Sequence, residues 1–338
     1  MTSPTSQRIA LLVGGGLDVC AAPELAARLR GAGYDVVVRL SVAAQQLVGA
    51  EAFRLAGVEI TDQLPPDGPV LLCPADAAAL ELCRPANRPV AGIGGVATEP
   101  TPLFAREDVL LAARWLLSPR PLAGRTVLIT AGPTAEDVDP VRFLTNRSTG
   151  RMGLALATTA ACLGARALLV HGPLTVRCPT MPGVTAIPVR SAREMHTAVM
   201  ARVTECDAAI LCAAVADFTP SNPTDRKIKK SGQDELVLTL TRTPDILASL
   251  GALDPRPYLV GFAAETHDLE RYAQDKLRRK NCDLMCANDV AAADSGFAVA
   301  TNRITIFRRD AAPLPLPLLD KEAAAERILL LVAEALNR

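Results

Sequence analysis

Three short segments that lie close together in the sequence carry residue types suited to holding phosphate groups. They are Thr130–Thr134 (TAGPT), Asp139–Phe143 (DPVRF) and Asn146–Gly150 (NRSTG). The apolar run at 124–130 is typical of a buried parallel strand, and the small residues at 150–161 predict a helix packed against a sheet. Ser148, Thr149 and Gly150 would then start that helix, where unpaired backbone N–H groups and the helix dipole attract anions.

Two lysine clusters and two aspartates could complete a site for a nucleoside triphosphate. Residues 227–230 (KIKK) form a compact basic cluster, and Lys276 and Lys280 form a second pair one helical turn apart. Such clusters usually mark only a solvated surface. Asp217 or Asp245 could hold a magnesium ion that bridges phosphate oxygens. Together with the anion-binding helix start, these residues could neutralise a triphosphate if the fold brings them together.

No nucleophile or metal motif competes with this interpretation. His171, His196 and His267 lie far apart in the sequence, and neither G-x-S-x-G nor H-E-x-x-H occurs. The nine cysteines form no C-x-x-C pair and have no histidine placed to complete a zinc site. We therefore infer a site that works by positioning and charge neutralisation, as phosphoryl and nucleotidyl transfers commonly do.

The composition is that of an ordinary globular chain. Its 338 residues, 49% hydrophobic and 21% charged, suffice for two domains with separate cores. The 36 basic and 36 acidic residues cancel, which argues against a nucleic-acid partner but leaves room for a free nucleotide. No apolar run approaches membrane-spanning length and no secretion signal opens the sequence, so we expect a cytoplasmic protein with no membrane partner.

The elements that must position these residues form two alternating α/β series. The first series has strand-like runs at 9–13, 36–40, 70–73 and 89–93, which alternate with alanine-rich helical stretches. Two prolines in Ser118–Pro121 then interrupt the pattern, so we place domains at 1–118 and 119–338. The second series predicts a doubly wound Rossmann-like sheet, with strands at 126–130, 167–170, 208–212, 258–262 and 284–287.

One polar, lysine-rich segment at 213–243 breaks the second series. We expect a strand at 235–240 within it. An excursion of this length in an α/β domain is usually a lid, an arm or a dimer contact.

Taken together, these segments resemble the synthetase half of bacterial phosphopantothenoylcysteine decarboxylase/synthetase, a family of coenzyme A biosynthesis whose synthetase activity is that of a phosphopantothenate–cysteine ligase. The resemblance extends from Gly124 to about Asn302. Besides Lys276 and Lys280, the matching pieces are ITAGPT (129–134), DPVRFLTNRSTGRMG (139–153), CAAVADF (212–218), KIKK (227–230), TPDIL (243–247), GFAAET (261–266) and CANDV (286–290). The resemblance implies a ligase domain at 119–338, preceded at 1–118 by a shortened flavodoxin-like domain.

This resemblance implies two half-reactions. The carboxylate of 4′-phosphopantothenate would attack the α-phosphate of CTP, giving an acyl-cytidylate and pyrophosphate. The amine of L-cysteine would then attack the mixed anhydride and expel CMP, giving 4′-phosphopantothenoylcysteine. Both steps move negative charge, so a cationic pocket containing Mg²⁺ suits them.

The resemblance also implies roles for individual residues. Lys227 would neutralise the triphosphate, Asn146 would orient the acyl intermediate for attack by cysteine, and Ala213 would lie beside the nucleotide at a strand end. Asp217 is the expected metal contact. Because the synthetase domains of the family pair through the region of the lysine-bearing loop, we expect a homodimer. The expected CTP-binding residues are Asp217, Lys227, Pro244, Asp245, Ile246, Leu247, Phe262, Lys276 and Lys280.

The N-terminal domain resembles the flavoprotein half of the family only in its opening. That half requires a histidine between its second and third strands, a P-x-M-N-x-x-M-W segment and a late cysteine acid. Residues 50–72 contain no histidine, the chain has no Met-Asn pair, and no cysteine lies between Cys83 and Cys162. We therefore expect neither decarboxylation nor FMN binding.

Other functions stay open at this point. One is a bifunctional enzyme that also decarboxylates 4′-phosphopantothenoylcysteine with FMN. Another is a nicotinamide-dependent reductase, although Val19 replaces the glycine that would complete the fingerprint begun by Gly14–Gly16. A third is a non-catalytic nucleotide- or flavin-binding module. The choice of CTP over ATP rests on the similarity to the bacterial enzymes alone.

Overall fold

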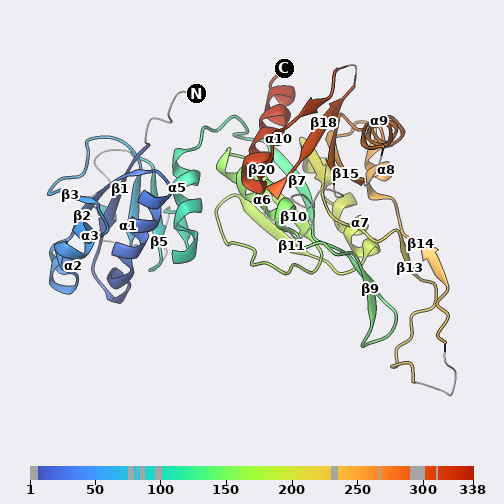
Figure 1. Ribbon diagram of the computed structural model, residues 1–338, viewed down its shortest axis with the longest axis horizontal. Coiled ribbons are helices and arrows are strands. Elements are labelled where there is room, and N and C mark those ends of the chain that lie inside the picture. The colour runs from blue at the N-terminus through green and yellow to red at the C-terminus, as the bar shows by residue number, and fades with distance from the viewer. Residues whose placement is uncertain are drawn as a thin grey trace. The chain divides into compact units, whose positions relative to one another are not determined.

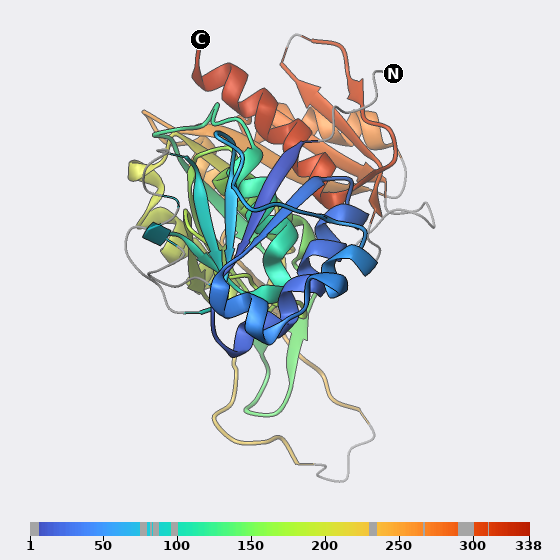
Figure 2. The same cartoon turned by 90° about the vertical axis from the view of Figure 1, so that its left-hand side faces the viewer.

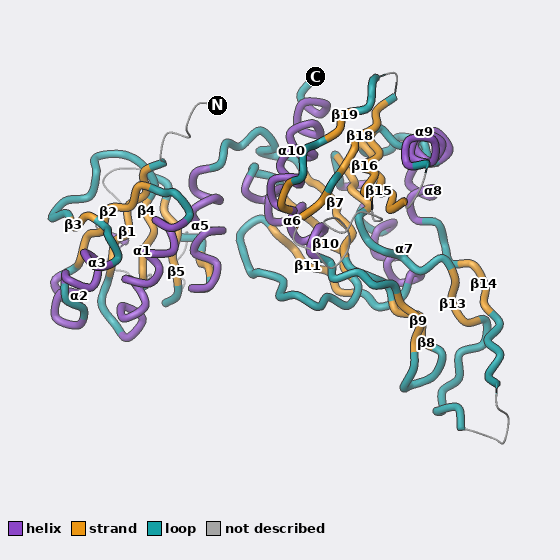
Figure 3. The backbone as a smooth tube through the Cα atoms, in the orientation of Figure 1, coloured by secondary structure: helices purple, strands orange, loops and turns teal. Residues whose placement is uncertain are grey.

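Two α/β units make up the chain, and the sequence passes from one to the other between Pro119 and Arg120. The first unit extends to Pro119 and includes Pro179–Pro182, and the second comprises Arg120–Cys178 and Gly183–Arg338. The computed structural model, shown in Figures 1 and 3, describes residues 7–74, 80–81, 83, 88–95, 101–229, 235–265, 268–289, 301–309 and 311–338.

The first unit is built on a parallel sheet with the strand order β3-β2-β1-β4-β5-β6. Its strands are β1 (Arg8–Val13), β2 (Asp35–Leu40), β3 (Glu59–Ile60), β4 (Val70–Cys73), β5 (Val90–Ile93) and β6 (Leu103–Phe104). Its described helices are α1 (Ala22–Gly31), α2 (Val42–Leu47), α3 (Ala50–Leu55) and α5 (Val109–Leu117), with 3-10 turns at Leu17–Ala21 and Arg106–Asp108. Without the two-residue strand β3, the order is that of a flavodoxin-like sheet. The predicted α/β class of this domain is confirmed.

The second unit contains an eight-stranded sheet with the order β11-β10-β7-β12-β15-β16-β18-β19. Its strands are β7 (Thr126–Ala131), β10 (Arg166–His171), β11 (Val184–Pro188), β12 (Ala208–Leu211), β15 (Tyr258–Glu265), β16 (Leu284–Asp289), β18 (Ile304–Arg308) and β19 (Leu314–Pro315). The first six strands in the order are parallel, and β18 and β19 are antiparallel additions. Numbered along the chain, the six parallel strands follow the Rossmann order 3-2-1-4-5-6. The predicted doubly wound sheet is confirmed.

Helices cover both faces of this sheet because its central strands are apolar on both sides. Val127 and Ile129 of β7 pack with α6 (Arg151–Cys162) and α10 (Lys321–Leu336). Leu128, which points to the other face, belongs to the core formed with α7 (Ala192–Met200), α8 (Ile246–Gly251) and α9 (Leu269–Arg279). A 3-10 turn follows α7 at Val203–Glu205. Among the described helices, none is long and apolar enough to cross a membrane.

Two segments project from this unit. The hairpin is formed by β8 (Ala135–Asp137) and β9 (Phe143–Thr145), and the arm is residues 218–242, held at its base by β13 (Phe218–Pro220) and β14 (Leu240–Arg242). Figures 1 and 2, which differ by a 90° turn, both show the two segments running side by side away from the sheet. A further small pairing joins β17 (Thr301–Asn302) to β20 (Leu319–Asp320).

The strand predicted at 235–240 was wrong in its position. Residues 235–239 have no regular structure, and the strand that forms, β14, begins at Leu240. The three residues of β14 pair with β13. Within the described part of the chain, the alternating apolar residues before Leu240 have no strand beside them to complete a sheet. Leu236, Val237 and Leu238 are instead exposed on the arm.

Candidate functional site

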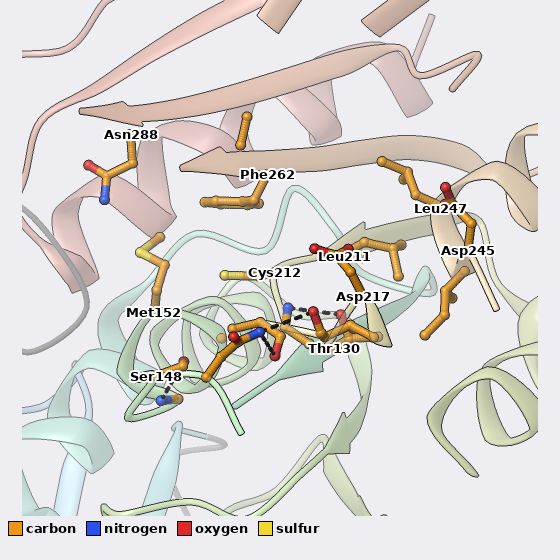
Figure 4. Close-up of a pocket in the computed structure, with 18 of the residues that line it drawn as sticks. Thr130, Ser148, Met152, Leu211, Cys212, Asp217, Asp245, Leu247, Phe262 and Asn288 are labelled. Carbon is orange, nitrogen blue, oxygen red and sulfur yellow. Dashed lines mark hydrogen bonds between the residues drawn. The ribbon is translucent and has the colours of Figure 1, made fainter. Parts of the chain in front are cut away.

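A cavity of about 840 Å³ opens at the carboxyl ends of β7, β12 and β15. In a sheet of this order a ligand crevice is expected where the winding reverses, which here is between β7 and β12. In Figure 4, Ser148, Met152 and Asn288 lie towards one end, termed the α6 end, and Asp217, Asp245 and Leu247 lie towards the other, termed the α8 end. The lining residues are Thr130, Asn146–Gly153, Leu211–Val215, Asp217, Phe218, Arg242–Leu247, Phe262, Ala263, Lys276, Arg279, Lys280, Asn288, Asn302 and Lys321.

The start of α6 forms the wall of the α6 end. Gly150 precedes the helix with φ 83°, a left-handed conformation that most side chains would strain. Gly153 brings the helix against β7, since a Cβ atom built on it would lie 2.3 Å from the Cβ atom of Ala131. The first backbone N–H groups of an α-helix have no partner within the helix, so this end of the cavity can bind an anion. The predicted location of Ser148, Thr149 and Gly150 at the helix start is confirmed.

The segment after β12 is fixed to β7 and to the segment that follows β7 by backbone and hydroxyl groups. The backbone N–H of Ala213 donates to the Thr130 hydroxyl at 3.1 Å, and that of Ala216 donates to the Thr134 hydroxyl at 3.0 Å. The N–H of Ala214 donates to the carbonyl oxygen of Gly132 at 2.9 Å. Ala213 therefore lies on a rigid rim of the cavity, where its small side chain leaves space for a ligand.

Asn146 bridges the base of the hairpin and this rim. Its amide nitrogen donates to the carbonyl oxygens of Ala214 and Val215, at 3.1 Å in each case. The NH₂ group has two hydrogens, so both are used to hold the side chain. Towards a ligand, Asn146 must therefore act through Oδ1, as an acceptor.

Four of the residues predicted to bind the nucleotide are joined at the α8 end. Asp245 caps α8 by accepting from the Ala248 N–H at 2.9 Å, and it forms an ion pair with Lys280. Partial burial raises the pKa of Asp245, but the hydrogen bonds from Lys280 and Ala248 outweigh it, so the pKa lies below its usual range. Lys276 donates to the carbonyl oxygen of Phe262 at 3.0 Å, which ties α9 to the second half of β15.

The chemistry of the lining is cationic. Among the described lining residues, the two carboxylates are Asp217 and Asp245, against seven cations: Arg147, Arg151, Arg242, Lys276, Arg279, Lys280 and Lys321. Burial raises the pKa of Cys212 to about 12, which keeps this thiol protonated at neutral pH and removes it as a nucleophile. Histidine is absent from the part of the lining that the structure describes. This arrangement suits binding and neutralisation of phosphate charge rather than covalent catalysis.

The described residues include no group of three or more His, Cys, Asp or Glu side chains that could hold a metal. Asp217 is exposed at the cavity, whereas Asp245 is engaged by Lys280. Of the two carboxylates, Asp217 is therefore the better placed to contact a ligand or a metal ion.

Lys227 is the predicted residue that the chain does not bring to its own cavity. It lies exposed on the arm and is not among the lining residues. Its neighbour Ile228 is clamped to the hairpin, since its N–H donates to Asp139 at 3.1 Å and its carbonyl oxygen accepts from Arg142 at 2.9 Å. Lys230, the last residue of the cluster, lies outside the described residues, as does His267.

A family match covers the whole of this site. The family described as "DNA/pantothenate metabolism flavoprotein C-terminal domain" matches residues 122–336, which include every lining residue of the cavity. The chain belongs to this family.

Similar proteins place the chain within the family. The Coenzyme A biosynthesis bifunctional protein CoaBC of Vibrio cholerae is 50% identical over 219 residues, which cover 64% of this chain and 54% of that protein. In this match the chain spans about half the length of its relative. The protein of the same name from Escherichia coli K12 is 34% identical over 395 residues, which cover 97% of each chain. A crystal structure of the C-terminal domain of CoaBC is 40% identical, covers 64% of this chain and 98% of its own, and superposes with a TM-score of 0.55.

Several lining residues within the family domain were not predicted to be part of the site. Arg147, Arg151 and Asn288 lie inside segments that carry the family resemblance, so their positions next to predicted residues were a usable signal. Asn302 and Lys321 gave no such signal. They reach the cavity from β17 and α10, at the C-terminal end of the family domain.

Proposed function

We propose that this protein is a CTP-dependent phosphopantothenate–cysteine ligase of coenzyme A biosynthesis. The observation that carries the proposal is the cavity at the switch point of the second sheet. It combines a helix start, seven cations and the rim formed by Ala213 and Asn146. The names of the relatives that match this region support the same pathway.

In the first half-reaction, a carboxylate oxygen of 4′-phosphopantothenate attacks the α-phosphorus of CTP, and pyrophosphate leaves. The nucleotide would occupy the α8 end, where residues 244–247 and Phe262 flank the base and ribose and Lys276 and Lys280 neutralise the phosphates. A magnesium ion held by Asp217 and the phosphates would offset the charge on the leaving pyrophosphate.

In the second half-reaction, the amine of L-cysteine attacks the acyl carbon, the bond to the CMP oxygen breaks, and the amine loses a proton. Asn146 Oδ1 would accept a hydrogen bond from the attacking amine, because both amide hydrogens are committed to Ala214 and Val215. Held in this way, the acceptor fixes the direction of attack.

The exposed position of Lys227 is explained if the protein is a homodimer in which each copy lends its arm to the other. Apolar side chains on the hairpin and arm support such a contact, because large exposed apolar surface commonly marks an interaction site. They are Val141, Phe143, Phe218, Leu236, Val237, Leu238 and Leu240, with exposed fractions from 37% to 84%. Lys227 would then reach the triphosphate bound by the second copy.

The first unit would play no catalytic part. The alignment with the Escherichia coli relative extends over 395 positions, more than the 338 residues of this chain, so it must open gaps in this chain. Together with the absent histidine and Met-Asn pair, this supports a shortened flavoprotein-type domain without decarboxylase activity or FMN.

The test is a reconstituted assay with purified protein, 4′-phosphopantothenate, Mg²⁺ and either CTP or ATP, with and without L-cysteine. Cysteine-dependent release of CMP together with 4′-phosphopantothenoylcysteine is the expected result. Loss of carbon dioxide from that product would show decarboxylation. Absence of turnover with both nucleotides would overturn the ligase and favour a binding module.

Exchange of arms is tested by mixing two inactive variants, Asn146→Asp and Lys227→Gln. If each site uses the arm of the other copy, a mixed dimer contains one site with both wild-type residues, and activity returns after the variants are unfolded and refolded together. If each site uses its own arm, every site in the mixture carries one substitution and activity stays absent.

A further inference from the structure

A buried lysine lies in the wall of the α6 end, outside every segment that carries the family resemblance. Lys321, the first residue of α10, lines the cavity and is 4% exposed. Its Nζ donates to Oδ1 of Asn302 at 2.8 Å. Asn302 is 3% exposed, and its Nδ2 donates to the sulfur of Met152 on α6 at 3.3 Å. Side chains from α10, β17 and α6 thus meet in one contiguous wall.

The surroundings of Lys321 disfavour its positive charge. Burial is the main cause that lowers its pKa, and Arg151 at the start of α6 lowers it further, while Cys212 and Glu322 act in the opposite direction. Burying an ammonium group costs free energy that an anion can offset. An anion at this end of the cavity would meet the exposed Arg151 and the buried Lys321, and near the poorly hydrated Lys321 charge–charge attraction is stronger than in water.

Asn302 adds a donor that a ligand could use. Its N–H partner is a thioether sulfur, which is a weak acceptor, so replacing that sulfur by a ligand oxygen would strengthen the hydrogen bond. The backbone N–H groups at the start of α6 lie on the same wall. Lysine, amide and helix start together suit an oxygen-rich terminal group with two negative charges.

We propose that Lys321, oriented by Asn302, is the residue that makes the site specific for an acid bearing a terminal phosphomonoester. This inference rests on the proposed function and deepens it. An acid that presents its carboxylate to the nucleotide at the α8 end must extend its other end towards the α6 end. There the ammonium group of Lys321 contacts the phosphate and discriminates against the same acid ending in a hydroxyl.

The test is steady-state kinetics of Lys321→Met, which keeps an unbranched side chain one atom shorter and removes the charge. The KM for 4′-phosphopantothenate is expected to rise about 10- to 100-fold, since a hydrogen bond to a charged group is lost. The KM for CTP is expected to change less than about twofold. The preference for 4′-phosphopantothenate over pantothenate should fall by the same factor by which the KM for 4′-phosphopantothenate rises.

A second variant tests the same inference if the first one fails to fold. Asn302→Asp keeps the shape of the side chain but places a carboxylate beside Lys321, so an internal anion competes with the substrate phosphate. It is expected to raise the KM for the acid as Lys321→Met does. Arg327→Met is the matched control, because it removes a charge from an exposed position on the same helix and should leave both KM values unchanged.

Thermal stabilisation by 4′-phosphopantothenate, pantothenate and inorganic phosphate separates this inference from the proposed function. If the wild type turns over but Lys321→Met and Asn302→Asp keep its KM for the acid, the inference fails and the ligase stands. If 4′-phosphopantothenate stabilises the wild type alone and no product forms, the ligase fails and the phosphate site stands. A raised KM for CTP in place of the acid would assign Lys321 to the nucleotide and overturn the inference. A wild type that neither binds the acid nor turns over would overturn both.

Discussion

The cavity wall and the arm hold the two residues expected to act in successive half-reactions, and they are built in opposite ways. Asn146 is fixed by two hydrogen bonds to the rim of the cavity. Lys227 is exposed on a projecting segment whose nearest anchor is the backbone of the next residue. The comparison teaches that a residue which orients an intermediate needs a rigid support, whereas one that supplies charge can be carried by a segment that docks later.

The largest expected effect comes from disturbing the wall itself. Gly153→Leu would force α6 away from β7, because even a Cβ atom would lie 2.3 Å from that of Ala131. We expect a loss of about 3 kcal/mol or more in the free energy of unfolding, measured by urea denaturation, with loss of all activity. Gly31→Ala is the control, since nothing lies within 4 Å of a Cβ atom built there. If Gly153→Leu were as stable as the wild type, the close packing of α6 against β7 would be refuted.

Removing the charge of Lys227 on the arm should strongly lower turnover without changing the stability of the fold. Lys227→Gln is expected to lower kcat/KM for CMP release about 100- to 1,000-fold, the usual loss when one group that stabilises transition-state charge is removed. Its thermal midpoint should equal that of the wild type, because the side chain is exposed. Arg226→Gln, at the adjacent exposed position, should keep its activity. Equal losses in the two variants would reduce the role of Lys227 to the general charge of the arm.

A smaller effect is expected where the arm is anchored. Asp139 accepts from the side chain of Arg142 and from the N–H groups of Val141 and Ile228, and Asp139→Asn removes an acceptor from this cluster. We expect kcat to fall about tenfold with the KM for CTP nearly unchanged, because the arm docks less often in its productive position. A change in the KM for CTP alone would argue against the view that the Asp139 cluster, the clamp between hairpin and arm, positions the arm.

The same clamp predicts a pH dependence of stability. The hydrogen bonds from Arg142, followed by those from backbone N–H groups, outweigh burial and hold the pKa of Asp139 well below its usual range. A carboxyl group with a lowered folded-state pKa stabilises the fold above its unfolded pKa of about 3.9, and that stability is lost as the pH falls through the folded pKa. The difference in thermal midpoint between wild type and Asp139→Asn should therefore be full at pH 7 and shrink below about pH 4.

The smallest effect is expected at the surface of the hairpin. Asp137 and Arg190 form an ion pair 2.6 Å apart, with exposed side-chain fractions of 47% and 49%. Asp137→Asn should cost less than about 1 kcal/mol of unfolding free energy and leave the kinetics unchanged. The remaining difference should disappear in 1 M salt, where the screening length is about 3 Å. A larger loss would mean that the base of the hairpin, and not only the clamp at Asp139, positions the arm.

Much of the fold could be predicted from the sequence because buried parallel strands leave a strong pattern. The strand expected at 70–73 is β4, and the helix expected at 150–161 differs from α6 by one residue at each end. The strand expected at 235–240 failed because alternation predicts an amphipathic strand but not the partner that completes it. Among the described residues of the arm, Leu240–Arg242 has that partner, in β13.

The site was predictable as far as its residues lie in segments that follow strands. Ala213 lies just after β12 and Phe262 lies in the second half of β15, and both line the cavity because the carboxyl ends of parallel strands meet at one edge. Asn146, which follows the hairpin strand β9, lines it as well. Lys321 could not be found in this way. After Asp320, a helix cap that accepts from Ala323, a lysine in the first turn has the sequence pattern of any solvated helix start. Its burial results from the packing of α10 against the rest of the unit.

An arm that serves another copy makes the specific activity depend on the concentration of the protein. Under the proposed exchange, a solitary copy can bind its substrates but lacks the lysine of the first chemical step. Its specific activity would then fall on dilution below the dimer dissociation constant, and product formation would rise more steeply than in proportion to chain concentration. Under this proposal, the exposed arm would couple consumption of CTP to the encounter of two chains.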